Sequence, residues 1–314
     1  MRGRLAAVMF LLCPSVLLFG QDEALQKAPL PTGVILVKGA EPSASDSVTP
    51  VPESGMVNRS VFQNDYFGLT YRLPADWVQE YPGPPPSDSA NYVLAQLEPS
   101  SSFRGSDKGT ILISAQDLFF AGSSAANAME VIQYSRDKLP SYYDVERSPA
   151  ELKIAGRSFA RFDYRSEVAG LHWYVFATEV RCHAVQFIFN SRDPEMLERL
   201  VAELGNMKLK EPSSAPVCIP DYASDQNVVQ KVDAVITDHR ASPMPVRIII
   251  DRKGRVKHVH VINAFREQGR AITDALMQWT FKPYMQNGKA VEVETGILFG
   301  SSRAEKLKAD SASR

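Results

Sequence analysis

"ALMQWTFKPYMQNGKAVEV", residues 275–293, decides the fold of the C-terminal part of the chain. Ile272, Leu276 and Trp279 recur at i, i+4 and i+7, so they share one face of an amphipathic helix. Pro283 ends the helical stretch, because proline lacks the amide hydrogen that a helix interior needs. The first half of this stretch therefore predicts a helix with an apolar stripe that packs against a sheet.

The second half predicts a tight turn and a returning strand. Asn287-Gly288 favours the turn, because both residue types tolerate the backbone angles that turns require. The segment "KAVEVETGILFG" (289–300) then predicts the closing strand. Trp279 and Phe281 would each bury about 150–250 Å² in such a unit, so they supply much of a small core.

A hairpin precedes the helix. It consists of a strand, "PVRIII" (245–250), a turn, "DRKG" (251–254), and an antiparallel return, "RVKHVHVINA" (255–264). Gly254 stands at the turn position that requires a positive φ. The order strand, strand, helix, strand predicts a small α+β domain with three strands backed by one helix, and we assign residues 226–300 to it.

This β-β-α-β pattern resembles the TonB C-terminal domain family. The residues that carry the resemblance are Ile250, Asp251, Gly254, Val256, Ala275, Trp279, Phe281, Pro283, Asn287, Gly288, Lys289, Val291 and Val293. The structural core of the motif is then expected to comprise Gly254, Ile272, Leu276, Trp279, Phe281, Pro283, Asn287 and Gly288.

The chain also departs from that family. Pro245-Val246 stands where many members have Gly-x-Val, an upstream aromatic-proline pair is missing, and the long Pro-rich spacer of energy transducers is absent. A whole globular domain precedes the unit instead. These departures argue against an ordinary energy transducer.

The resemblance implies a way of binding. In the family the last strand pairs with a short extended segment of an outer-membrane receptor, and an edge strand offers the unpaired backbone groups for it. Exposed side chains such as Glu292 and Glu294 are expected to set the register. The alternative is that the first domain, the tail or a second copy covers this edge. The predicted partner-binding residues are Val291, Glu292, Val293, Glu294, Thr295, Ile297 and Phe299.

A larger domain is predicted for residues 62–209. Strands, a helix within 124–139, a strand meander and an amphipathic helix from Asp193-Pro194 follow in order, which predicts an antiparallel sheet with helices. The opening "YFGLTYRLPADW" (66–77) resembles the PsbP-like α/β/α sandwich group through Phe67, Gly68, Tyr71, Pro74 and Trp77. The resemblance implies a binding or assembly unit without catalysis.

The remaining segments are polar or terminal. Arg2 and Arg4 precede about 15 mostly apolar residues, the length of a secretory signal, so residues 1–20 are predicted to be a signal peptide. The alternative is an uncleaved anchor in the inner membrane. Residues 21–60 are predicted to be a disordered tether, 210–225 a linker and 301–314 a disordered tail.

Two cysteines remain beyond the predicted signal peptide. Cys182 and Cys218 could pair in an oxidising compartment and would then tie the first domain to the linker. The alternative is one core cysteine and one unrelated surface cysteine.

Neither catalysis nor metal binding is predicted. The chain lacks the short catalytic and phosphate-binding motifs, its formal charge is -1, and no block of basic residues suits nucleic acid. His258 and His260 are expected to be surface imidazoles. We therefore expect no catalytic residue, no metal site and no cofactor.

The sequence predicts an exported, non-enzymatic protein, periplasmic or secreted, that binds a protein partner at the cell envelope. An outer-membrane protein is one candidate partner, nucleic acid is not, and the membrane is a partner only if the N-terminus stays uncleaved. One alternative is a TonB-like energy-transducing component with that anchor. Another is a periplasmic small-ligand-binding protein that uses an aromatic cleft around Tyr66, Trp77 and Trp173.

Overall fold

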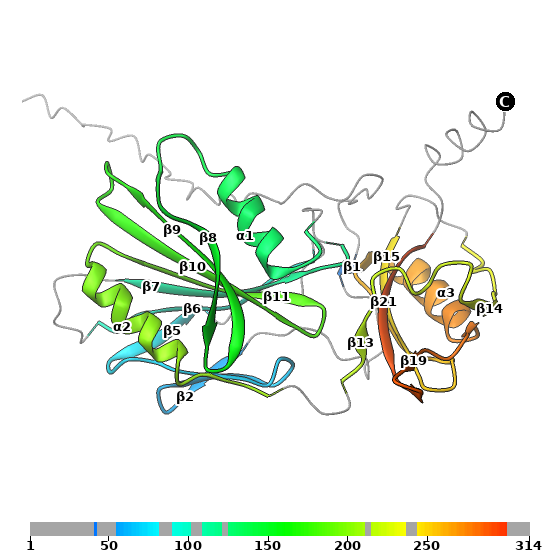
Figure 1. Cartoon of the computed structure of the whole chain (residues 1–314). Coiled ribbons are helices and arrows are strands. Elements are labelled where there is room, and N and C mark those ends of the chain that lie inside the picture. Colours follow the sequence, from blue (N-terminus) through cyan, green and yellow to red (C-terminus); the bar gives the residue numbers. More distant parts are fainter. Residues whose placement is uncertain are drawn as a thin grey trace, which may run out of the picture.

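The computed structural model describes residues 41–42, 55–81, 90–101, 109–120, 125–210, 215–236 and 244–299. The predicted signal peptide, the predicted tail and most of the predicted tether lie outside these residues. The described elements form two lobes, a larger one built on a broad sheet and a smaller C-terminal one (Figure 1).

The larger lobe is built on a seven-stranded antiparallel sheet with the order β5-β6-β7-β11-β10-β9-β8. Side chains alternate between the two faces of each strand, so Phe187 and Phe189 belong to one core and Ile188 packs against another. The strands are β5 (Trp77–Tyr81), β6 (Asn91–Pro99), β7 (Thr110–Asp117), β8 (Asp144–Ile154), β9 (Arg157–Ser166), β10 (Leu171–Val180) and β11 (His183–Ser191).

One face of this sheet is covered by α2 (Pro194–Leu204) and by a four-stranded sheet with the order β12-β4-β3-β2. Asp193 caps α2 by accepting a hydrogen bond from the Glu195 N–H, and Pro194 occupies the first turn, where its missing N–H is harmless. The small strands are β2 (Met56–Asn58), β3 (Val61–Asn64), β4 (Leu69–Arg72) and β12 (Lys208–Leu209).

The other face is covered by α1 (Ala128–Asp137), which lies on the opposite side of the sheet from α2 (Figure 1). Asn127 caps α1 by accepting from the Glu130 N–H. Ala128 and Ile132 pack with Phe162 and other residues of the sheet. Helix, sheet and helix-plus-sheet thus form three layers.

The smaller lobe contains a four-stranded sheet with the order β13-β21-β15-β16, backed by α3 (Arg266–Leu276). Its long strands are β15 (Met244–Ile250), β16 (Val256–Val261) and β21 (Val293–Phe299), and β13 is Val217–Cys218. Two-residue or three-residue strands complete the lobe: β1 (Glu41–Pro42), β14 (Val228–Gln230), β17 (Asn263–Ala264), β18 (Thr280–Phe281), β19 (Met285–Gln286) and β20 (Lys289–Ala290).

The turns of this lobe follow the local sequence. Gly254 has φ +79, and a Cβ there would lie 2.0 Å from the Phe281 carbonyl oxygen, so only glycine fits. Asn287 and Gly288 both have positive φ and close the β19–β20 hairpin. The Trp279 indole N–H donates to the Val232 carbonyl at 2.7 Å, which satisfies the one polar atom of that buried side chain.

The α+β fold class is confirmed, with two differences in detail. β2 lies inside the segment predicted to be a disordered tether, because its residues pair with β3, and β1 in the same segment pairs with β17. The smaller sheet has four strands where three were predicted, because the linker contributes β13.

Candidate functional site

The candidate site is the outer edge of β21, the strand predicted to bind a partner. β21 pairs antiparallel with β15 along its whole length, from Val293 opposite Ile250 to Phe299 opposite Met244. Val293, Ile297 and Phe299 point to the core beneath α3. The even-numbered residues therefore point to the other face, toward the larger lobe.

The linker covers part of this edge. β13 pairs in parallel with β21, with Val217 opposite Val293, and lies beside it between the lobes (Figure 1). The Val217 N–H donates to the Glu292 carbonyl at 2.7 Å, and the Ile219 N–H donates to the Glu294 carbonyl at 3.0 Å. The expectation of an uncovered last strand is thus wrong for residues 292–294. A two-residue strand in a Pro/Ser-rich linker has no periodicity that could reveal it.

The rest of the edge lies beyond this cover. Since the carbonyls of Glu292 and Glu294 point to β13, alternation turns the N–H groups of Gly296 and Leu298 to the same side. Pro220 follows Ile219 and has no N–H with which to continue the pairing. The Leu298 side chain is 40% exposed. Within the described residues, the outward N–H groups of Gly296 and Leu298 therefore lie past the last hydrogen bond that the linker donates.

The predicted register residues have other partners. Glu292 is half-buried and accepts from the Lys257 ammonium at 3.1 Å. Glu294 is 3% exposed and lies in the interior between the lobes. The expectation that these two carboxylates are exposed is wrong, because Glu294 packs against the larger lobe and Glu292 is partly covered where it pairs with Lys257. Of the other predicted residues, Val293 and Thr295 are buried, and Val291, Ile297 and Phe299 are half-buried.

Arg247 lies between two buried carboxylates. Its Nη2 donates to Glu294 Oε1 at 2.7 Å, and its Nη1 donates to Asp117 Oδ2. Asp117 also accepts from the backbone N–H groups of Phe119 and Phe120 at 2.7 and 3.1 Å. The arginine on β15 thus joins the end of β7 in the larger lobe to β21 in the smaller lobe.

The electrostatics of this cluster follow from its burial. Burial alone would lower the pKa of Arg247, but the carboxylates of Asp117 and Glu294 outweigh it and hold the pKa well above its usual value. Burial and the charge of Arg247 lower the pKa of His183 well below its usual range. The same two causes lower the pKa of His260 to about 3. The cluster therefore contains a cation, Arg247, between the side chains of Asp117 and Glu294, and two imidazoles that are neutral at neutral pH.

Aromatic contacts surround the ion cluster. A Cβ on Gly296 would lie 2.7 Å from Phe120 Cζ and 3.0 Å from Phe119 Cβ, so the glycine lets the larger lobe approach the strand closely. Phe119, Phe120, Ala90 and Ile262 form an apolar cluster from both lobes. The guanidinium of Arg247 lies 4.7 Å from the centre of the Phe119 ring, a distance suited to a cation–π contact.

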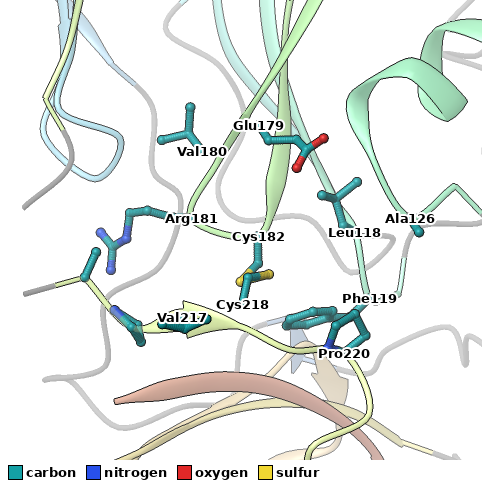
Figure 2. A pocket seen from close by; sticks show the side chains of 12 residues that line it. Leu118, Phe119, Ala126, Glu179, Val180, Arg181, Cys182, Val217, Cys218 and Pro220 are labelled. Atoms are coloured by element: carbon teal, nitrogen blue, oxygen red, sulfur yellow. A yellow bond between two sulfur atoms is a disulfide. The ribbon is translucent and has the colours of Figure 1, made fainter. Parts of the chain in front are cut away.

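A disulfide joins the larger lobe to the linker strand. Cys182 occupies the second position of the two-residue turn between β10 and β11, where Arg181 and Cys182 both have positive φ. Its sulfur is bonded to that of Cys218 on β13. The bond borders a surface pocket of about 480 Å³ that is also lined by Phe119, Arg181 and Val217 (Figure 2). Cys218 is exposed, and Cys182 is buried.

The remaining candidates from sequence do not form a site. Tyr66 and Trp77 lie in the core of the larger lobe, whereas Trp173 stacks on Tyr164 with ring centres 5.0 Å apart, so the three aromatics share no cleft. His260 is 3% exposed and is not a surface imidazole. Within the described ranges, no group of three His, Cys, Asp or Glu residues is arranged to hold a metal ion. Nor does any helix in those ranges have the length and apolar character to cross a bilayer.

Comparison with known proteins supports the resemblance of the C-terminal lobe. Residues 243–300 match the family described as Gram-negative bacterial TonB protein C-terminal. Among solved structures, the solution structure of cyanobacterial PsbP (CyanoP) from Synechocystis sp. PCC 6803 is similar, with 12% identity and a TM-score of 0.33. That match covers 52% of this chain and 96% of that chain. No curated protein matches the sequence significantly.

Proposed function

We propose that this chain is an exported, non-enzymatic protein of the cell envelope that binds a protein partner through its C-terminal lobe. The partner contributes an extended segment that pairs with the outer edge of β21. The larger lobe acts as a second binding or assembly unit, held in a fixed position relative to that edge. The match of residues 243–300 to the TonB C-terminal family carries the proposal.

The geometry of β21 supports strand addition. The N–H groups at Gly296 and Leu298 face away from β15 and lie past the last donor of β13. Edge groups of this kind are a template for an added strand, in which the main chain supplies affinity and alternate side chains supply specificity. Among the described strands, the long outer edge of the larger sheet suits this role less well. β8 is bulged at two places, contains Pro149 and carries charged side chains, which are features that protect an edge.

The disulfide supports an extracytoplasmic location. Disulfides persist in oxidising compartments such as the periplasm and are rare in the reducing cytoplasm. Cys182 and Cys218 are the two cysteines outside the predicted signal peptide, and the structure bonds them to each other. Export by the N-terminal segment would place them where this bond is stable.

Leu298→Pro tests the proposal. Proline removes the outward N–H of residue 298 but leaves the β15 pairing, because that residue's backbone groups point away from β15. Leu298→Ala is the matched control, since it shortens the same half-exposed side chain and keeps the N–H. Val293→Pro would be a poorer choice, because its backbone groups face β15 and its side chain is 1% exposed in the core.

The measurement is a crosslinking pull-down from envelope extract, with quantification of the captured proteins. We expect Leu298→Pro to lower the recovery of specific partners about tenfold and Leu298→Ala to keep it within about twofold, since a lost main-chain bond and a misshaped edge weaken binding by about 1.4 kcal/mol. Equal recovery of the same partners by both variants would exclude strand addition at this edge.

A further inference from the structure

The edge of β21 already has an occupant, which is the chain's own linker. The N–H groups of Val217 and Ile219 donate to the carbonyls of Glu292 and Glu294, as the strand of a partner would. We propose that residues 217–219 are an internal ligand that a partner segment displaces when its pairing extends from Gly296 toward Val293, and that the Cys182–Cys218 disulfide controls this displacement. The inference rests on the proposed function, because it describes the regulation of the same edge.

The occupant indicates the chemistry of the displacing segment. β13 runs parallel to β21, so a segment that takes its place runs parallel as well. Ile219 packs against the core beneath α3, whereas the neighbouring Cys218 points to the larger lobe, where it is bonded. The replacing segment is therefore extended, with apolar β-branched side chains at alternate positions and a small side chain between them.

The linker strand is held by its disulfide and by hydrogen bonds of the residues that follow it. On one side the disulfide fixes Cys218 to the hairpin turn of the larger lobe. On the other side Thr295 Oγ1 donates to the Pro220 carbonyl at 3.1 Å, and the Tyr222 hydroxyl donates to the Lys282 carbonyl at 2.6 Å. Two backbone hydrogen bonds add only modestly to stability. The covalent bond is therefore the strongest constraint that keeps the strand in place.

The bond is chemically accessible to a dithiol reductant. Cys218 is exposed and borders the 480 Å³ pocket, whereas Cys182 is 4% exposed, so a reductant's thiolate attacks the sulfur of Cys218 and displaces the sulfur of Cys182. The reductant's second thiolate then attacks the mixed disulfide and releases Cys218. Two electrons pass to the protein, both cysteines take up protons and become thiols, and the reductant becomes a disulfide. Glu294 Oε2, 3.8 Å from the Cys182 sulfur, can accept the new S–H.

After reduction, residues 217–219 are no longer fixed on the edge of β21 by a covalent bond, and they compete with a partner as a tethered segment. The linker still competes with a partner because both of its ends remain attached, and short tethers give effective concentrations of about millimolar. The apparent dissociation constant of a partner equals its intrinsic value divided by the fraction of molecules with an open edge. A rise of that fraction from about 1% to about 10% tightens apparent binding about tenfold.

Amide hydrogen exchange on the full chain tests the opening of the edge, before and after dithiothreitol, with thiol alkylation and mass spectrometry to verify reduction. We expect the amides of Val217 and Ile219 to exchange at least about tenfold faster after reduction. The amide of Val293, which faces β15, is the internal control and should not change. Equal exchange of Val217 and Ile219 in the two verified states would overturn the inference.

A labelled peptide tests the occupancy of the edge. Its sequence is residues 214–220 with Cys218→Ser, and fluorescence anisotropy measures its binding to the full chain. We expect the reduced chain and the Cys218→Ser chain to bind it at least about tenfold more tightly than the oxidised chain. Val217→Pro keeps the disulfide but removes one donor, so it should strengthen binding without reduction. If Cys218→Ser does not fold, the comparison of peptide binding by the unaltered chain before and after dithiothreitol still tests the inference.

The two proposals fail in different ways. If envelope partners bind equally in the oxidised and reduced states and Leu298→Pro abolishes capture, the edge is the binding site but the disulfide does not control it. If reduction opens the edge and the peptide binds, but no envelope protein is captured in either state, control by the disulfide stands and the proposed partner role fails.

Discussion

Arg247 determines how the two lobes meet. Its guanidinium is 3% exposed and pairs with Asp117, which is 130 positions away in sequence, and with Glu294, which is 47 positions away. A charge so deeply buried is tolerated only when it is paired and fully hydrogen-bonded. The strand "PVRIII" was predicted correctly, but the partners of its arginine lie too far along the chain for a local pattern to identify them.

His260 gives the stability a defined pH dependence. Burial and the charge of Arg247 lower its pKa from 6.5 to about 3. Above pH 6.5 the imidazole is neutral in both states and contributes no difference. Below that value His260 is protonated in the unfolded chain but stays neutral in the folded chain. The free energy of unfolding therefore falls as the pH falls from about 6.5 to about 3. The slope for one such histidine is about 1.4 kcal/mol per pH unit.

We expect His260→Gln to reduce this acid sensitivity. The variant removes the group that the unfolded state protonates, so its loss of unfolding free energy between pH 6.5 and pH 5 should be about 2 kcal/mol smaller than that of the parent chain. The lowered pKa of His183 changes stability with pH in the same direction, and this histidine is present in both the parent chain and the variant. Urea unfolding at a series of pH values gives the measurement. Parallel pH profiles for parent and variant would contradict the assignment to His260.

At the scale of elements, local sequence patterns predicted the helices and turns, but they did not predict which strands far apart in the sequence pair with each other. The apolar spacing of Ile272 and Leu276 predicted α3, and Asn287-Gly288 predicted the last hairpin, because neighbours within a few residues decide both. The prediction that the helix includes Trp279 and ends at Pro283 was wrong, because α3 ends at Leu276 and the strand β18 follows. β13 was missed, since Val217 and Cys218 form a strand only because β21 lies beside them. The candidate edge was therefore identified correctly as a strand and incorrectly as fully uncovered.

Gly296 tests how closely β21 and the larger lobe pack. Its φ does not lie in the left-handed region, so any penalty of a side chain is steric, and the added Cβ would lie 2.7 Å from Phe120 Cζ. We expect Gly296→Ala to lower the free energy of unfolding by about 1–3 kcal/mol, as for other overpacked contacts. Leu298→Ala, in the same strand but half exposed, is the control and should cost less than about 1 kcal/mol.

A second substitution tests whether the contact with Phe120 causes the loss of stability in Gly296→Ala. Phe120→Leu shortens the ring that the new methyl group would meet, so the double variant should be more stable than the sum of the two single effects predicts, by about 0.5–1.5 kcal/mol. Denaturant titration of the four proteins in the cycle gives this coupling. Strict additivity would show that the methyl group is accommodated elsewhere.

For the whole molecule, the arrangement of the lobes matters as much as either fold. The lobes are linked by the Cys182–Cys218 bond, by the Arg247 ion cluster and by apolar contacts around Phe119 and Phe120. Two sequence resemblances predicted the parts, but the junction between them depends on residues that no family pattern contains. The outer edge of β21 is consequently held at a fixed angle to the larger lobe.

We expect the oxidised chain to unfold as one cooperative unit in a calorimetric scan, because the junction is built like a domain core. Arg247→Leu leaves the carboxylates of Asp117 and Glu294 buried without their cation, which costs about 3–5 kcal/mol. After reduction of the disulfide, that variant should show two transitions, since neither the covalent link nor the ion cluster then couples the lobes. Lys257→Ala, which breaks the partly exposed pair with Glu292, is the control and should cost less than about 1 kcal/mol and keep one transition. Two transitions in the oxidised parent chain would mean that the lobes fold independently and that the junction does not couple them.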